Sequence, residues 1–217
     1  MVIEACDSNF LIVVVKLNNS ISLFIVDSKS EGLEIKSDVF MDAGRYSSIK
    51  FNNVKVSAAN QLDIEIKGEN ILKSVIEIGS IGLSCEMLGS VQAAFNQTMD
   101  YIKEREQFGT KIGTYQGLQH RAAELFCEIE LCKSIVLKSL QSIDEDHENL
   151  SQYSHLAKAK LGEVLKLTSN EAIQMHGGIG VTDDVNIGFY LKRARVIQRL
   201  LGDTNYHLNC IAKQKGY

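Results

Sequence analysis

Hydrophobic and polar residues change their spacing once along this chain, near residue 66. Before that point the apolar residues form short runs, FLIVVV at 10–15 and SLFIVD at 22–27, with the length and β-branched content of strands. Asn18 and Asn19 lie between the two runs, which indicates a turn-like link. The first part of the chain is therefore predicted to be a sheet.

A second strand pair is predicted in SSIKFNNVKV, residues 47–56. Ile49 and Phe51 alternate with polar residues, Asn52 and Asn53 follow, and two valines continue the pattern at 54 and 56. This arrangement favours a half-buried hairpin or a bulged strand pair. Three or four strands make an incomplete sheet, since a β domain normally needs more strands to close its core.

After residue 70 the apolar residues recur at spacings of three, four and seven, which is typical of amphipathic helices. On the first helix the apolar face is predicted to contain Val75, Ile78, Ile81, Leu88, Val91, Phe95 and Met99. The expected helices are 71–104, 116–143, 150–175, 187–201 and 204–214. The predicted fold class is α+β: a partial antiparallel β sheet in residues 1–66, followed by an antiparallel four-helix-type bundle in residues 67–217.

Composition narrows the functional classes. A formal net charge of −4 gives no broad basic surface, so nucleic acid is not expected as a partner. No apolar run has membrane-spanning length, and the first residues lack a signal-peptide layout. The five cysteines show no paired spacing, and the histidines show no metal-ligand spacing, so we expect a cytoplasmic protein without a metal site.

Three closely spaced glycines occur in SNEAIQMHGGIGVTDD, residues 169–184. Gly177 alone is enough to end a helix, which leaves Gly178 and Gly180 without a local reason. Bare backbone of this kind lets a phosphate or a cofactor edge approach closely. A tight interhelical turn that needs glycine only for packing explains the same residues equally well.

A second candidate loop lies in YIKEREQFGTKIGTYQGLQH, residues 101–120. Arg105 closes one long helix and offers a planar fork for phosphate, and Phe108 offers a face for a ring system. The alternative is that Arg105 only caps its helix and that Phe108 fills the core.

Together, these two stretches resemble the C-terminal helical domain of the acyl-CoA dehydrogenases. The loop REQFGTKIG, the helix end AIQMHGGIG and the segment LKRARVIQRLLGDTNYH occur in the family's order. The residues before 67 resemble the later strands of that family's middle β domain. The family's N-terminal helical domain and its TEP-like and GSD-like segments have no counterpart in this sequence.

The resemblance implies FAD as cofactor, held across a dimer interface by the two loops. Arg105 and Gln107 would contact its pyrophosphate region, Phe108 would pack on the flavin side, and Thr204 would lie near the flavin of the chain's own site. Gln174, Met175, Gly177 and Gly178 would line its adenosine end. Tyr115 and Gln116 lie where the family also contacts the cofactor.

The family's catalytic base does not occur in this sequence at either of its usual places. The common place, a glutamate in the last loop, is Gly202, and the less common one, on the first long helix, is Gly79. Asp203 is the nearest replacement for a proton-abstracting carboxylate. A helix N-cap is the competing and favoured role for Asp203.

The resemblance implies a flavin-dependent acyl-CoA dehydrogenase, or a truncated portion or subunit of one. It would oxidise an acyl-CoA thioester, pass electrons to an electron-transfer flavoprotein, and assemble as a homo- or hetero-oligomer, dimer or tetramer. The alternatives are a non-catalytic partner subunit that completes a FAD pocket and a truncated relic that only oligomerises.

Overall fold

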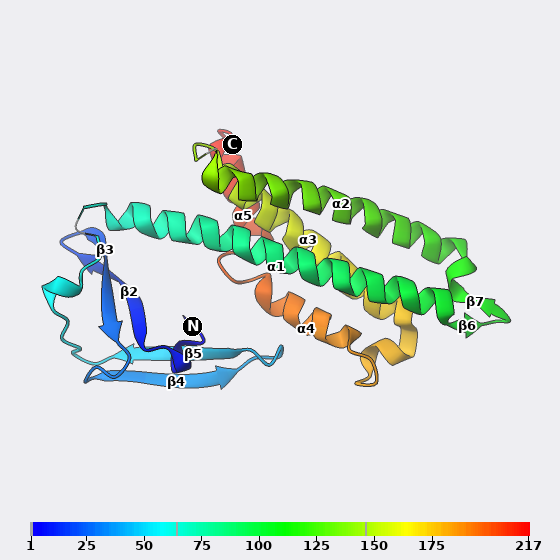
Figure 1. Cartoon of the computed structure of the whole chain (residues 1–217), viewed down its shortest axis with the longest axis horizontal. Helices are drawn as coiled ribbons and strands as arrows, with labels where there is room; N and C mark the ends of the chain where they lie inside the picture. Colours follow the sequence, from blue (N-terminus) through cyan, green and yellow to red (C-terminus); the bar gives the residue numbers. More distant parts are fainter. Residues whose placement is uncertain (1, 64, 146) are drawn as a thin grey trace. The chain divides into compact units, whose positions relative to one another are not determined.

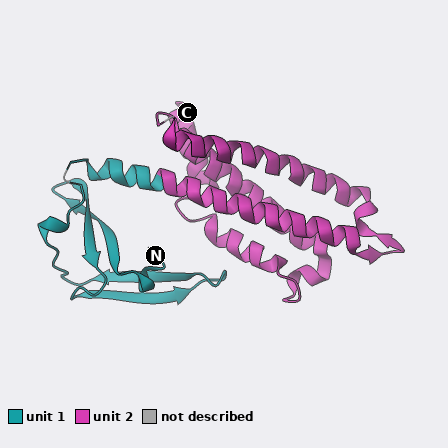
Figure 2. Cartoon of the chain, in the orientation of Figure 1, with its two compact units in different colours: residues 1–76 teal, residues 77–217 magenta. Residues whose placement is uncertain are grey.

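The computed structural model describes residues 2–63, 65–145 and 147–217. It divides into two compact units, Met1–Ile76 and Glu77–Tyr217 (Figure 2). The first unit carries the larger strands and the second is helical (Figure 1). The predicted α+β class is confirmed.

The strands of the first unit are antiparallel, as predicted, but they form two small sheets. One is the hairpin of β2 (Phe10–Leu17) and β3 (Ser20–Asp27). The other has the order β1-β5-β4, from β1 (Val2–Ile3), β5 (Arg45–Phe51) and β4 (Leu33–Val39). Short 3₁₀ turns cover Ala5–Asp7 and Ala58–Asn60.

The turn between β2 and β3 is the predicted Asn18-Asn19 pair. Both residues have positive φ, 49° and 66°, and Leu17 pairs with Ser20 on either side of them. A two-residue turn of this kind matches the twist of its strands, and asparagine tolerates the left-handed conformation.

The second hairpin, predicted within 47–56, is wrong. β5 ends at Phe51, and residues 54–56 are not in a strand. Ile49 and Phe51 pair with Ile35 and Leu33 of β4. The sequence pattern does not indicate this partner, because β4 has only two apolar residues, Leu33 and Ile35, before its sequence turns polar.

The second unit contains most of the helical bundle. The helices are α1 (Gly68–Glu104, which starts in the first unit), α2 (Gln116–Asp144), α3 (Leu150–His176), α4 (Ile187–Ile197) and α5 (Thr204–Gln214). All five predicted helices are present. α4 ends four residues earlier than predicted, because Leu201 and Gly202 both adopt positive φ, at 55° and 105°, which a helix does not accommodate.

Four helices contribute to the main core, and the predicted apolar faces meet there. The buried cluster consists of Met87, Val91, Ile129, Cys132, Val136, Leu161, Val164, Leu165, Ala194 and Ile197. Ile81 is also buried, whereas Val75 and Ile78 from the same predicted face are exposed. The periodic pattern therefore identified the core except at the start of α1.

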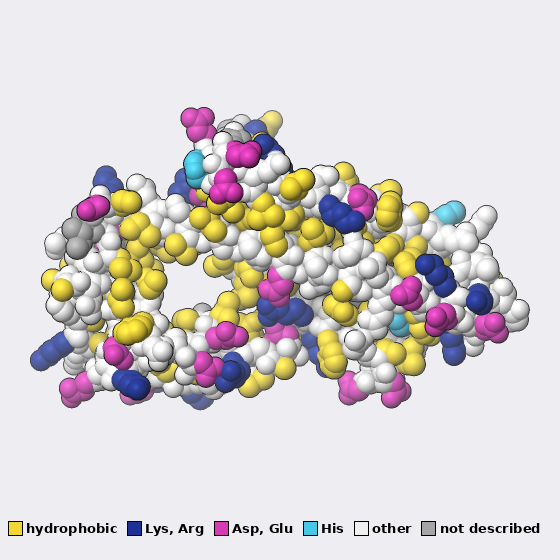
Figure 3. Space-filling model, viewed as in Figure 1, with side chains coloured by type: hydrophobic (Ala, Val, Ile, Leu, Met, Phe, Trp, Pro, Cys, Tyr) yellow, Lys and Arg dark blue, Asp and Glu magenta, His cyan; other side chains and the backbone are white. Residues whose placement is uncertain are grey.

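Apolar side chains also remain exposed on the first unit. Phe10, Ile12 and Val14 alternate along β2 and leave one side of the hairpin uncovered, and Figure 3 shows hydrophobic side chains over β2 and β3. Among the described residues, no helix combines the length and apolarity that crossing a membrane requires.

Candidate functional site

The segment after α1 is a small hairpin with an aromatic tip. Strands β6 (Glu106–Gln107) and β7 (Thr110–Lys111) pair across Phe108 and Gly109, whose φ angles are 56° and 79°. The Ile112 N–H donates to the Arg105 carbonyl at 2.8 Å and closes the loop. Because the Phe108 side chain is 92% exposed, its alternative role as a core residue is wrong.

The glycines at the end of α3 have three different environments. Gly177 ends the helix with φ 66°, a conformation that favours glycine. A Cβ on Gly180 would lie 2.8 Å from the Ile173 carbonyl oxygen, so packing alone excludes a side chain there. A Cβ on Gly178 would have no described atom within 4 Å. Packing within the described part of the chain therefore does not explain why residue 178 is a glycine.

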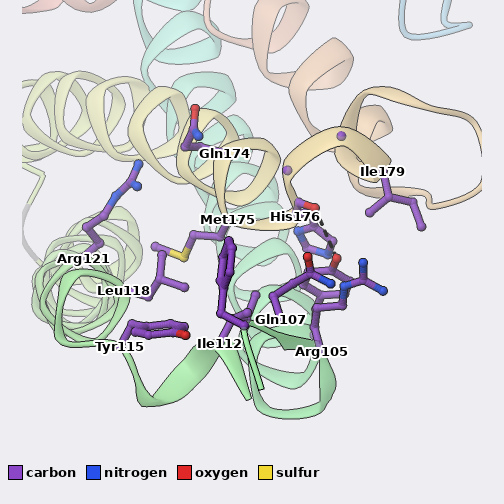
Figure 4. A pocket seen from close by; sticks show the side chains of 14 residues that line it. Arg105, Gln107, Ile112, Tyr115, Leu118, Arg121, Gln174, Met175, His176 and Ile179 are labelled. Atoms are coloured by element: carbon purple, nitrogen blue, oxygen red, sulfur yellow. Dashed lines mark hydrogen bonds between the residues drawn. The ribbon is translucent and has the colours of Figure 1, made fainter. Parts of the chain in front are cut away.

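The hairpin and the end of α3 face one cavity of about 550 Å³ (Figure 4). In this view Gln174, Met175 and His176 come from the end of α3, above Tyr115, Gln107 and Arg105. Eight of the ten residues predicted to bind cofactor line this cavity: Arg105, Gln107, Phe108, Tyr115, Gln174, Met175, Gly177 and Gly178. The structure therefore brings together two segments that are about seventy residues apart in the sequence.

Six further residues line the cavity and were not predicted: Tyr101, Ile112, Leu118, Arg121, His176 and Ile179. Tyr101 stacks on His176 with ring centroids 4.3 Å apart, and its hydroxyl donates to the His176 carbonyl at 3.2 Å. Tyr101 lies four residues before Arg105, so helical spacing was the available signal. The Tyr101 contact fixes the end of α3 against the end of α1.

Arg121 and Glu171 join α2 to α3 beside the cavity. The Arg121 Nε donates to Glu171 Oε2 at 2.5 Å, and this hydrogen bond raises the pKa of Arg121 above its ordinary value. Both side chains are partly buried, so the pair is less exposed to solvent screening than a surface ion pair.

Asp203 and Thr204 lie elsewhere, in a second groove of about 370 Å³ that also involves Gly162, Arg195 and Arg199. The Asp203 carboxylate accepts a hydrogen bond from the Tyr206 N–H at 2.9 Å and caps α5, as its favoured role predicted. Gln116 begins α2 and is not among the residues that line these two cavities. The described residues contain no group of three or more His, Cys, Asp or Glu side chains that could hold a metal.

The two places where the family keeps its base differ in the space that a side chain would have. Gly202 has φ 105°, and a Cβ there would overlap the Tyr206 ring and lie 3.0 Å from His207 Nε2. A Cβ on Gly79 would lie 2.9 Å from Leu201 Cδ1, the flexible end of a side chain. A side chain at residue 202 would therefore be strained and crowded in this turn, whereas a Cβ at residue 79 needs only a shift of the Leu201 side chain.

Residues 67–216 match the family model described as "Acyl-CoA dehydrogenase, C-terminal domain", so the chain belongs to the acyl-CoA dehydrogenase family. The chain is 31% identical over 196 residues to the short/branched chain specific acyl-CoA dehydrogenase, mitochondrial, of Rattus norvegicus. That alignment covers 89% of this chain and 45% of the relative, so the chain spans about half the length of this relative.

Solved structures share the fold. Butyryl-CoA dehydrogenase from Megasphaera elsdenii superimposes with a TM-score of 0.89 at 24% identity, over 96% of this chain and 56% of that one. A structure described as PigA with FAD and proline gives a TM-score of 0.91 at 20% identity, over 99% of this chain and 58% of that one. The resemblance in the sequence motifs is confirmed at the level of the family.

Proposed function

We propose that residues 67–217 are the C-terminal helical domain of a flavin-dependent acyl-CoA dehydrogenase and that residues 1–66 are the end of its middle β domain. The observation that carries the proposal is the convergence of the Arg105–Gly109 hairpin and the Gln174–Gly178 helix end on one cavity. Neither the exposed Phe108 nor the open backbone at Gly178 is explained by packing within the described residues, and the meeting of the two segments favours a shared ligand.

The residues around the cavity fit a dinucleotide such as FAD. Gly178 leaves backbone open to close approach, the Arg105 guanidinium suits a phosphate, and the exposed Phe108 ring can pack against a planar ring system. The PigA structure, which shares the fold, was described with FAD. By resemblance, the FAD at this cavity belongs to the site of a neighbouring subunit.

The proposed reaction is α,β-dehydrogenation of an acyl-CoA thioester. Bound FAD would supply the acceptor for the hydride that leaves the β-carbon. The chain's own cavity residues would bind and orient the dinucleotide and shield it from water. Removal of the α-proton by Asp203 stays a prediction; its Oδ1 caps α5.

A second candidate is a partner subunit that completes a FAD pocket and contributes no base. The sequence favours it, because the two places where the family keeps its base are Gly79 and Gly202, which carry no carboxylate. Acyl-CoA as substrate, an electron-transfer flavoprotein as electron acceptor, and a homo- or hetero-oligomer as assembly are proposals that follow from the family. The cytoplasmic location stays a prediction, and the rat relative is described as mitochondrial.

Flavin binding tests the proposal directly. The purified chain is titrated with FAD, and flavin fluorescence and absorbance give the stoichiometry. Gly178→Val fills the open backbone and should weaken binding at least tenfold; Gly89→Ala, at another glycine with open space around it, is the matched control. A chain that takes up no FAD, alone or as an oligomer, refutes the proposal.

Reduction of bound flavin by a panel of acyl-CoA thioesters separates the two candidates. Bleaching of the flavin absorbance by one thioester class supports the dehydrogenase. A flavin-loaded protein that no thioester reduces supports the partner subunit. If bleaching occurs, an undiminished rate in Asp203→Asn removes Asp203 from the role of base.

A further inference from the structure

Lys158 on α3 is a buried cation that neither proposed cavity uses. Its side chain is 1% exposed, in the interior of the second unit. Its ammonium nitrogen donates to the carbonyl oxygens of Gly202 at 3.0 Å, Gln198 at 3.2 Å and Ile197 at 3.4 Å. An ammonium group has three N–H donors, so this set of acceptors matches it in number.

These three carbonyls belong to the end of α4 and to the turn that leads to α5. The last carbonyls of a helix lack intrahelical donors and carry the negative end of its dipole, which favours a cation. Burial nevertheless lowers the pKa of Lys158 to about 8, and the Asp203 carboxylate opposes that effect. Burying a lysine here costs solvation free energy, and its three hydrogen bonds to backbone carbonyls are contacts that an apolar side chain cannot make.

The rest of the turn is packed closely against α3. Gln198 Nε2 donates to the Gly162 carbonyl at 2.7 Å, and Thr204 Oγ1 lies so close to Gly162 that a Cβ there would overlap it. Gly202 itself has φ 105°. In a trans peptide the C=O and the next N–H point in opposite directions, so drawing the Gly202 carbonyl inward turns the Asp203 N–H away from Lys158.

We propose that Lys158 is a positioning residue: through the Gly202 carbonyl it sets the turn so that Asp203 and Thr204 face the groove in which a flavin of the chain's own site would lie. This inference rests on the proposed function for the identity of the ligand. The effect of Lys158 on the geometry of the turn can be measured without any ligand. In this role Lys158 acts through its hydrogen bonds to the backbone carbonyls of Ile197, Gln198 and Gly202.

Three variants test this role. Lys158→Met keeps a long unbranched side chain but removes all three donors, and Lys158→Arg restores charge and donors. Lys160→Met, two residues further along α3, is the matched control, because that lysine pairs with Glu128 on a part-exposed surface. The readouts are amide hydrogen exchange of residues 199–206 and the FAD dissociation constant, both on the full chain.

Lys158→Met is expected to raise exchange in 199–206 at least tenfold and to weaken FAD binding at least tenfold, with exchange in the rest of α3 unchanged. Lys158→Arg should recover part of both effects, and Lys160→Met should show neither. Wild-type exchange in the turn of Lys158→Met overturns the proposal. If the wild-type chain binds no FAD, the proposed function fails while the exchange measurement still decides the role of Lys158.

A pH titration gives an independent test on the wild-type chain, which also serves if Lys158→Met does not fold. Between pH 7 and 9.5 Lys158 loses its proton and one of its three donors, so exchange in 199–206, corrected for the intrinsic rate, should increase with a midpoint near pH 8. The groups that interact electrostatically with Lys158 are Asp203 and His207, and His207 pairs with His155. Burial lowers the pKa of His207 to about 4, so it stays neutral in this range. A turn whose corrected exchange is flat across this range contradicts the proposal.

Discussion

Gly178 and Gly180 lie two residues apart, and we expect substitution by alanine to have different effects on stability at the two positions. In Gly180→Ala the new Cβ would lie 2.8 Å from the Ile173 carbonyl oxygen and 2.9 Å from the His176 Cβ. Ordinary contact begins at 3.4 Å, so backbone atoms would have to separate by about 0.6 Å (3.4 − 2.8). Overpacking of this kind costs about 1–3 kcal/mol, which corresponds to a Tm decrease of roughly 2–12 °C in a chain of this size.

Gly178→Ala should leave stability unchanged or raise it by up to about 1 kcal/mol, because its Cβ meets no described atom and its φ is not positive. Urea unfolding followed by circular dichroism gives the midpoint and the slope for both variants. Equal midpoints for wild type and Gly180→Ala, or a loss in Gly178→Ala as large as that in Gly180→Ala, would refute the reasoning from packing. FAD binding of Gly178→Ala should weaken even though its stability does not.

Three further outcomes are expected. Gly202→Ala should lower the free energy of unfolding by more than about 2 kcal/mol, since it adds a Cβ against Tyr206 and His207 at positive φ; a wild-type urea midpoint would contradict this. Asp203→Ala should cost about 0.5–2 kcal/mol through loss of the α5 cap, and Asp203→Ser should recover most of it. The pKa of His207 is lowered from 6.5 to about 4, so the unfolded chain binds the proton first, and stability should fall by up to roughly 3 kcal/mol as pH drops from 6.5 to 4. In His207→Asn that dependence should disappear, and a difference between the two proteins that stays constant with pH would refute the assignment.

The helical half of the fold could be predicted closely from the sequence. Long periodic segments, interrupted by glycine and charged residues, predict all five helices, and the apolar faces of α1 to α4 contribute to the main core. The apolar pattern does not predict the end of α4, because it continues through Leu200 and Leu201, whereas Leu201 and Gly202 adopt positive φ. Strand pairing was less predictable, because β4 pairs with the next strand in the sequence but carries only a weak apolar pattern of its own.

The sequence predicts most of the site residues that belong to the two recognisable loop motifs. It does not predict residues elsewhere on the helices that line the same cavity. Phe108 and Gly178 stand out in the sequence, and both line the cavity. Tyr101 and Arg121 lie on helix faces whose orientation toward the cavity depends on packing between α1, α2 and α3. The separation of Thr204 from the loop residues agrees with the resemblance, which implies that Thr204 lies near the flavin of the chain's own site and the loops near that of a neighbouring subunit.

Phe108 is held in a left-handed conformation at the tip of a hairpin, where asparagine would be easier to accommodate by roughly 1 kcal/mol or more. Its ring is almost fully exposed, so its own chain offers little packing in return. A thermostability screen on the isolated polypeptide would therefore select against this aromatic residue and discard it early. Only a selection carried out in the presence of the molecule that contacts the Phe108 ring would keep this residue. The residue that directed evolution selects at position 108 therefore shows whether such an external contact exists.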